Sequence, residues 1–408
     1  MPTGPAAVNR RDGGPLRIGL VTPAWPGTQT ANGIATAVAH LAVGLEACGH
    51  EVTILAGGID AAHDHPRVVR LPPMQIGLVD RLRMRINAEA GLGVSVAMRH
   101  AAAIREAQSR YGVEIVVMEE TQGWAGEARR RVGIPVVATL HGPWWLHRAA
   151  AGAEDEARSA RREAREAAGL RRVDAITAPS HDVMARTEAA WGLPDIPRAV
   201  IRNPVPLPRD PVPPDSALLE RLLFVGRFDR IKGGDLVVEA FARIAAAQPR
   251  CRFTFAGPDT GMLRAGGGQV TLADTLAGLP DGLRARIDVT GPQTRDEIAG
   301  LRRSHGITMI ASRYETFGGT LVEAMAAGSA VVCTRVGGCQ ENVVHDSTGL
   351  LVPSEDATAL ADACLRLMAD PALAQRLGKA ARRFAAEELA PEVIGSQMAG
   401  FLAPLCRR

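Results

Sequence analysis

Short apolar runs rich in β-branched residues alternate along the chain with longer segments of helical periodicity. This alternation is typical of βαβ units, in which a helix connects two parallel strands of one sheet. In the first half of the chain the apolar runs predict strands at 16–21, 51–55, 115–118, 135–140, 175–178 and 199–201. The segments between them predict helices at 33–48, 83–110, 154–172 and 181–191. The first half is therefore expected to form a doubly wound α/β domain.

The alternation stops at a proline-rich segment and then starts again. Six prolines fall between positions 204 and 214, where missing amide donors exclude both a helix and a central strand. Beyond them, strands are predicted at 222–225, 252–256, 287–290, 307–310 and 330–333. We therefore expect two Rossmann-like domains, at 1–205 and 206–390, with the polar residues 1–15 disordered. Two such domains should bind a ligand in the cleft where the carboxyl ends of both sheets face each other.

Composition narrows the classes of partner. The 408 residues have a net charge of +3 and only 4% aromatic side chains, which argues against nucleic acid as a partner. The six cysteines are scattered and the first residues are polar, so we expect reduced thiols and a cytoplasmic protein. A basic segment with Arg81, Arg83 and Arg85 could touch an anionic membrane, but a solvated basic face is the favoured interpretation.

The segment 312–328 carries the most informative pattern. Glu315 and Glu323 are separated by seven residues, and Gly318 and Gly319 lie between them, directly after a predicted strand. Glycines let backbone amides approach a ligand, and the N-terminus of the following helix attracts anions. A phosphate beside hydroxyl-binding carboxylates would suit this segment. For Glu323 a helix capping box with Thr320 is an equally good explanation.

A second loop after a strand, at 226–234, combines glycines with basic side chains. Arg227 and Lys232 could contact phosphate, or could be ordinary surface charges. The chain has 47 basic residues, of which only Lys232 and Lys379 are lysine. Because arginine is used at almost every other basic position, the lysine at position 232 indicates that this position specifically requires lysine.

Two positions in the first half are weaker candidates. Gly33, in the loop after the first strand, could allow close approach of a phosphate, although a polar helix cap explains that loop equally well. His141 follows a predicted strand, where a cleft residue is expected. A lone histidine is more often structural, and that alternative stays open here.

The motifs together resemble those of the retaining glycosyltransferases of family 4, which have the GT-B fold. The resemblance rests on the loop 226–233, on the stretch from Glu315 to Glu323-Ala324-Met325-Ala326, and on 337–341, and it covers most of the chain. Ala311 and Asn32 depart from the family pattern, which usually has proline and glycine there. We expect both departures to affect loop rigidity and not the chemistry.

The resemblance implies a site for a nucleotide-sugar donor. Arg227 and Lys232 would neutralise the diphosphate, Glu323 would hold the ribose hydroxyls, and Glu315 would contact sugar hydroxyls. It also implies donor contacts along the loop that consists of Thr316, Phe317, Gly318 and Gly319. From the first domain, Gly33 would approach the diphosphate. His141 would contact the donor sugar near the reaction centre.

The family also implies that the C-terminal helix, within 391–408, crosses back to the first domain, which would hold the acceptor. Its loops carry carboxylates and indole rings that could suit a cationic or sugar-like acceptor: Glu119, Glu120, Trp124 and Trp145. A helix cap and core packing explain these four residues equally well.

The implied reaction is transfer of a hexose from a nucleotide sugar to a hydroxyl of a small-molecule, glycan or lipid-linked acceptor, with retention. UDP-sugars are the favoured donors and GDP-sugars come next. No cofactor or metal is expected, because cationic side chains can stabilise the leaving diphosphate and the chain has no Asp-x-Asp triplet. The alternatives are a non-catalytic nucleotide-sugar binding protein or another GT-B activity, such as an epimerase or a phosphorylase.

Overall fold

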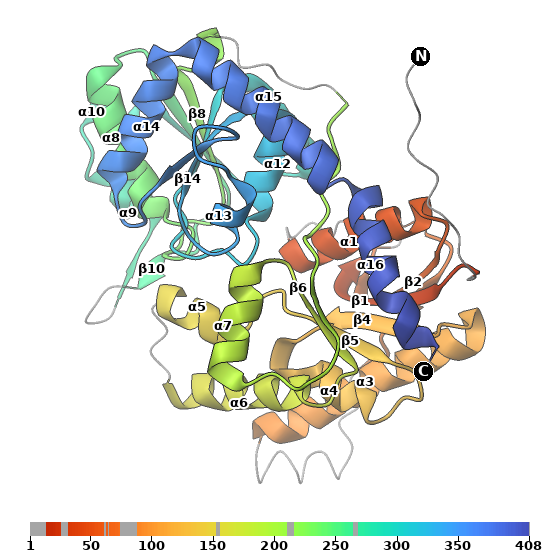
Figure 1. Ribbon diagram of the computed structural model, residues 1–408. Coiled ribbons are helices and arrows are strands. Elements are labelled where there is room, and N and C mark those ends of the chain that lie inside the picture. The colour runs from red at the N-terminus through yellow and green to blue at the C-terminus, as the bar shows by residue number, and fades with distance from the viewer. Residues whose placement is uncertain are drawn as a thin grey trace, which may run out of the picture.

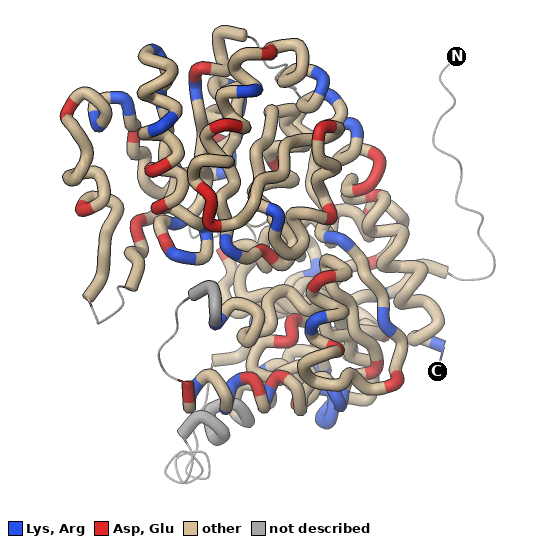
Figure 2. The backbone as a smooth tube through the Cα atoms, turned by 60° about the vertical axis from the view of Figure 1, so that its left-hand side comes forward, with Lys and Arg blue, Asp and Glu red and all other residues tan. Residues whose placement is uncertain are grey.

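The computed structural model describes residues 14–25, 32–60, 63, 65–73, 88–151, 156–209, 216–263 and 268–407. Two parallel sheets, each with helices on both faces, form two domains joined by a linker (Figure 1). Figure 2 shows basic and acidic residues interspersed over both domains, in keeping with the small net charge. The expected pair of doubly wound domains is confirmed.

The N-terminal sheet has the strand order β3-β2-β1-β4-β5-β6-β7, and all its pairs are parallel. Its strands are β1 (Arg17–Trp25), β2 (Glu51–Ile59), β3 (Val68–Arg70), β4 (Ile115–Glu119), β5 (Val136–Thr139), β6 (Ala175–Ala178) and β7 (Arg198–Val200). Its helices are α1 (Gly33–Ala47), α3 (Ala88–Tyr111), α4 (Trp124–Arg129), α5 (Trp144–Ala151), α6 (Glu156–Leu170) and α7 (His181–Trp191), with a 3₁₀ turn η1 (Thr121–Gly123).

The second sheet is parallel with the order β12-β9-β8-β13-β14-β15. Its strands are β8 (Arg221–Val225), β9 (Arg252–Ala256), β12 (Ile287–Gly291), β13 (Ile307–Ile310), β14 (Ala330–Thr334) and β15 (Leu350–Val352). A small antiparallel pair, β10 (Met262–Leu263) and β11 (Gln269–Val270), stands apart, and η2 (Ser216–Leu218) precedes the sheet. The helices are α8 (Gly234–Ala247), α9 (Leu272–Ala277), α10 (Asp281–Arg284), α11 (Arg295–Ser304), α12 (Gly319–Ala327), α13 (Cys339–Asn342), α14 (Ala357–Ala369), α15 (Pro371–Glu388) and α16 (Pro391–Cys406).

The predicted strands lie within a few residues of the observed ones, because each is a buried apolar run. Apolar runs missed β3 and β15, which have three residues each and lie at sheet edges. The predicted helix 83–110 corresponds to α3, and residues 83–87 of that prediction lie outside the described residues, as do Arg81, Arg83 and Arg85. The prediction about residues 1–15 also falls almost entirely outside them.

The C-terminal helix α16 packs on α1 of the first domain (Figure 1). Leu402 and Met398 join the core cluster of the N-terminal sheet. Small residues let the helices touch, because a Cβ at Gly44 would lie 1.9 Å from the carbonyl oxygen of Pro391. The chain end therefore ties the second domain back to the first. No helix among the described residues combines the length and the apolarity that crossing a membrane requires.

Candidate functional site

Lys232 and Glu315 form a partly buried ion pair although they lie far apart in the sequence. Lys232 follows β8 and Glu315 follows β13, and these two strands pair in parallel, so their carboxyl ends bring the two loops together. The Lys232 Nζ atom lies 2.6 Å from Glu315 Oε1, and the side chains are 25% and 11% exposed. Ser312 Oγ donates to the same carboxylate oxygen at 2.7 Å.

The charge state of Glu315 follows from these contacts. Burial alone would raise its pKa, but the Lys232 ammonium and the Ser312 hydroxyl outweigh burial and hold the pKa below its usual value. Glu315 is therefore an ionised carboxylate at neutral pH. It can accept hydrogen bonds from sugar hydroxyls while Lys232 supplies a positive charge beside it.

Asp229 organises the loop that carries the basic residues. Its carboxylate accepts from Arg227 Nε at 2.7 Å and from the Lys232 backbone amide at 2.7 Å. Arg227 itself is 51% exposed, so its guanidinium remains accessible to a ligand. Gly233 is the N-cap of α8 and has a left-handed φ of 70°, and a Cβ there would lie 2.0 Å from the Ala311 carbonyl oxygen. Sequence patterns did not point to Asp229.

Glu323 pairs with an arginine of a neighbouring helix. Its Oε2 atom accepts from Arg302 at 2.7 Å, and its side chain is about one-third exposed. The capping-box interpretation is wrong, because α12 begins after Gly318 and its N-cap makes no side-chain hydrogen bond. Thr320 is already inside the helix.

The glycines at 337 and 338 let the loop after β14 lie against the candidate donor loop. A Cβ at Gly337 would lie 2.0 Å from the Glu315 carbonyl oxygen, and one at Gly338 would lie 2.5 Å from that of Thr316. The Gly338 amide donates to Glu315 O, and Asn342 donates to Phe317 O. The Phe317 side chain is buried in the core, so only its backbone faces this loop region.

Gly318 and Gly319 differ in the space around them. Gly318 is the left-handed N-cap of α12, and a Cβ there would lie 2.8 Å from the Cys339 sulfur. A Cβ at Gly319, by contrast, would meet no described atom within 4 Å. The first turn of α12 therefore has open space beside it, which a ligand could occupy.

The two domains contact each other through this same loop. Thr316 Oγ1 donates to the carbonyl of His141 at 2.9 Å, and Ser180 Oγ donates to the carbonyl of Thr316 at 2.8 Å. Glu341 of α13 accepts from the amides of His181 and Asp182 at the start of α7, at 2.8 and 2.7 Å. Glu341 belongs to the motif at 337–341, yet its role could be seen only once the domains were placed.

On the first domain, His141 lines a small cavity together with Glu119, Thr139 and Asn203. Burial lowers the pKa of His141 to about 4, so the ring is neutral near pH 7. Gly33 is the first residue of α1, and a Cβ there would meet no described atom within 4 Å.

The loop before α1 has the polar cap that one interpretation anticipated. The Asn32 side chain accepts from the amides of Ile34 and Ala35, at 3.0 and 3.2 Å. Residues 26–31 of this loop lie outside the described residues. The departure at Asn32 therefore has a structural effect, since this side chain occupies amides of the first helical turn.

The four acceptor candidates differ in their surroundings. Glu119 is half-buried and lines the cavity beside His141. Glu120 is 2% exposed and points into the domain, where both oxygens accept backbone amides, which corrects its expected contact with an acceptor. Trp124 stacks on His100, and Trp145 packs in the same core cluster, so the core-packing interpretation describes both rings.

The candidate site contains cationic and anionic side chains with distinct chemical uses. Lys232 and Arg227 can bind a diphosphate, and Glu315 and Glu323 can bind hydroxyls. Within the described part of the chain, no group of three or more His, Cys, Asp or Glu side chains is arranged to hold a metal ion. The expectation of a metal-independent protein remains a prediction.

Comparison with known proteins agrees with this arrangement. Residues 31–209 match the sequence model of Glycosyltransferase Family 4, and residues 219–384 match that of Glycosyl transferases group 1. A D-inositol 3-phosphate glycosyltransferase of Nocardiopsis dassonvillei is 30% identical over 274 residues, which are 64% of this chain and 62% of the relative. One of Streptomyces avermitilis is 29% identical over 88% of this chain and 80% of its own length. The match thus spans less than two thirds of the Nocardiopsis relative.

Solved structures share the fold over nearly the whole chain. Sucrose-phosphate synthase from Thermosynechococcus elongatus has a TM-score of 0.73 and 25% identity, covering 96% of this chain and 99% of that one. Anabaena Alr3699/HepE, solved in complex with UDP-glucose, has a TM-score of 0.68 and 16% identity. The match covers 95% of this chain and 100% of that one. The chain thus has two parallel-sheet domains, matches both family models and shares its fold with these solved structures. It belongs to the family 4 glycosyltransferases and has the GT-B fold.

Proposed function

We propose that this protein is a retaining hexosyltransferase that moves a sugar from a nucleotide-sugar donor to a hydroxyl of a small-molecule, glycan or lipid-linked acceptor. The observation that carries the proposal is the partly buried pair of Lys232 and Glu315, joined at the carboxyl ends of neighbouring strands. A cation for the diphosphate and a carboxylate for sugar hydroxyls are thereby held side by side. An ion pair that is removed from water adds little to folding stability. A functional role is therefore the better explanation for this pair.

The donor is proposed to be a UDP-sugar, with GDP-sugars next. The fold neighbour from Anabaena was solved with UDP-glucose, which supports a nucleotide sugar as the donor for a chain of this fold. Arg227 and Lys232 would bind the diphosphate, together with the amides at Gly318 and Gly319 at the start of α12. Glu323 would accept from the ribose hydroxyls.

The proposed mechanism rests on the positive charges beside the expected position of the donor diphosphate. Glycosyl transfer passes through an oxocarbenium-like state and expels a diphosphate, so Lys232 and Arg227 would stabilise the charge that develops on the leaving group. We infer that this charge supply makes a metal unnecessary. A phosphate oxygen of the donor would take the proton from the acceptor hydroxyl, on the face from which the leaving group departs. His141, neutral near pH 7, would hydrogen-bond to the donor sugar.

Donor choice can be tested by thermal shift with UDP-, GDP-, ADP- and dTDP-sugars. A bound donor at one hundred times its Kd stabilises the protein by about 2.7 kcal/mol, and we expect UDP-sugars to raise the melting temperature most. The shift should disappear in Lys232→Met. No shift with any of the four nucleotides would contradict the proposal, whereas a shift without transfer to any hydroxyl acceptor would favour the non-catalytic alternative.

Glu119 offers a test of the acceptor side. Its carboxylate accepts from Thr121 Oγ1 at 2.9 Å and opens into the cavity beside His141, where an acceptor hydroxyl could donate to it. We expect Glu119→Gln to raise the acceptor KM about tenfold and to leave donor affinity unchanged, because one charge-assisted hydrogen bond is weakened. Glu114→Gln, just before β4 and therefore at its other end, is the matched control and should leave both constants unaltered. An unchanged acceptor KM in Glu119→Gln would exclude this role.

A further inference from the structure

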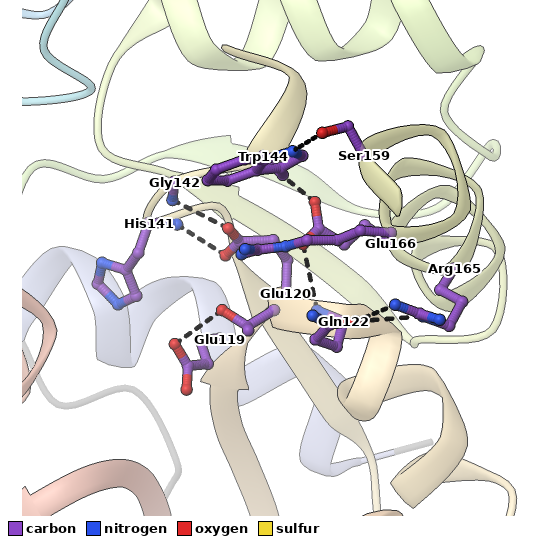
Figure 3. Close-up of polar contacts among 11 residues, drawn as sticks. Glu119, Glu120, Gln122, His141, Gly142, Trp144, Ser159, Arg165 and Glu166 are labelled. Atoms are coloured by element: carbon purple, nitrogen blue, oxygen red, sulfur yellow. Dashed lines mark hydrogen bonds and ion pairs between the residues drawn. The ribbon is translucent and has the colours of Figure 1, made fainter. Parts of the chain in front are cut away.

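The short loop that carries His141 has all its backbone donors bound by two buried glutamates. Glu120 accepts from the amides of His141 and Gly142, both at 2.9 Å, one with each carboxylate oxygen (Figure 3). Glu166 of α6 accepts from the amide of Trp144 at 2.9 Å. Because Pro143 has no N–H, no amide of residues 141–144 is left without a carboxylate acceptor.

Glu120 is held there at an energetic cost. It is buried, and it forms no ion pair within 4 Å with any residue that the structure describes. Burial, followed by the nearby carboxylates of Glu166 and Glu119, raises the pKa of Glu120 to about 8, so the ionised form of this side chain, in which both oxygens accept, is costly near pH 7. Glu166, by contrast, is paired with Arg162 at 2.8 Å. A fully buried acidic side chain without a cation destabilises the fold. Its hydrogen bonds to the loop therefore point to a functional role for Glu120.

The same loop is held from the opposite side of the cleft. The carbonyl of His141 accepts from Thr316 Oγ1, which belongs to the loop between Glu315 and α12. At the far end of the loop, the Trp144 indole donates to Ser159 Oγ at 2.9 Å (Figure 3). The backbone of His141 is thus bound on its amide side by Glu120 and by the carbonyl of Thr139, at 2.9 Å each, and on its carbonyl side by the second domain.

We propose that Glu120 is a positioning residue for glycosyl transfer, which sets the place of His141 through two backbone amides, with Glu166 holding the end of the same loop. This inference rests on the proposed function, because His141 matters only if a donor sugar lies beside it. Glu120 acts from inside the domain and does not touch donor or acceptor. Its effect on the reaction therefore passes through His141.

Glu120→Gln tests the proposal with almost no change in volume. A glutamine offers one oxygen and one NH₂ group to two amide donors, so one of the two hydrogen bonds is lost and an NH₂ group faces an N–H. A small displacement of a group that contacts the reacting sugar can cost as much as 10²-fold in rate. We expect kcat to fall at least tenfold while the Kd for UDP stays within twofold, and amide hydrogen exchange at His141 and Gly142 to become at least tenfold faster.

A double-mutant cycle with His141→Ala separates positioning from general structural support. If Glu120 acts through His141, Glu120→Gln should lower kcat less than twofold in the His141→Ala background. An equal loss in both backgrounds, or unchanged kcat in Glu120→Gln alone, would overturn the proposal. Glu127→Gln is the matched control, since Glu127 lies on α4 of the same domain and pairs with surface arginines, and it should keep transfer within twofold.

A second variant and the activity of the wild-type protein separate a failure of this proposal from a failure of the proposed function. If Glu120→Gln does not fold, the same cycle is run with Glu166→Gln, which should speed amide exchange at Trp144 and lower kcat only when His141 is present. Additive losses there would overturn the proposal. Failure of the wild-type protein to transfer sugar from any nucleotide donor would instead contradict the proposed function itself.

Discussion

Lys232→Met is expected to lower kcat/KM for glycosyl transfer by at least 10²-fold. The substitution keeps most of the side-chain length but removes the ammonium that would stabilise the departing diphosphate. It also leaves the buried Glu315 carboxylate with the Ser312 hydroxyl as its remaining side-chain hydrogen-bond donor among the described residues, and the loss of an ion-pair partner costs about 3 kcal/mol of folding stability. Initial rates with the preferred donor, together with urea unfolding, measure the two effects separately.

The chain supplies an unusually clean control for this experiment. Lys379, on the exposed side of α15, is the one other lysine among 408 residues, and Lys379→Met should alter neither transfer nor stability. A double variant, Lys232→Met with Glu315→Gln, removes the unpaired buried charge and should regain much of the stability but none of the activity. Near-normal transfer in Lys232→Met would remove the basis of the donor-site assignment.

Gly233→Ala is expected to have the second large effect, through the backbone. Gly233 has φ of 70°, and the added Cβ would lie 2.0 Å from the Ala311 carbonyl oxygen, so the Lys232 loop and the loop after β13 must separate. We expect a loss of at least about 3 kcal/mol in the free energy of unfolding, and a fall in transfer at temperatures where the variant is still folded. Urea unfolding and donor titration check both.

Gly192→Ala separates steric overlap from conformational strain. Gly192 ends α7 with φ of 59°, and a Cβ there meets no described atom within 4 Å. This variant should lose only about 1 kcal/mol, the ordinary cost of a left-handed non-glycine residue, and should keep full transfer. Equal losses in the two variants would show that close packing against Ala311 has no part in forming the site.

The sequence predicted the local elements well because their causes are local. Buried parallel strands are apolar runs, and the positions of β6, β9 and β13 agree with those runs residue for residue. Edge strands of three residues were predicted less reliably: β7 was predicted from its apolar run, whereas β3 and β15 were missed. The resemblance to the family then added the domain arrangement and a candidate donor loop.

Adjacent glutamates illustrate where local reasoning ends. Glu119 and Glu120 follow one another at the end of β4, and the sequence gives them the same chemistry. In the folded chain Glu119 opens into a cavity, whereas Glu120 turns inward to the amides of His141 and Gly142. No pattern in the sequence distinguishes them, because the partners of Glu120 lie in the loop that follows the neighbouring strand β5.

By itself the sequence determined two α/β domains and the loops in which polar groups follow strands, and it singled out Lys232 as a candidate, a lysine in a chain that uses arginine nearly everywhere else. Only the tertiary structure decided the partners: Glu315 for Lys232, Arg302 for Glu323, and Glu120 for the loop of His141. The physical reason is that the hydrophobic periodicity of a helix or strand depends only on the residues of that element. A hydrogen bond or ion pair between distant residues depends on which strand ends the parallel sheets bring together. Lys232 and Glu315 lie 83 residues apart in the sequence, and Thr316 and His141 lie 175 residues apart.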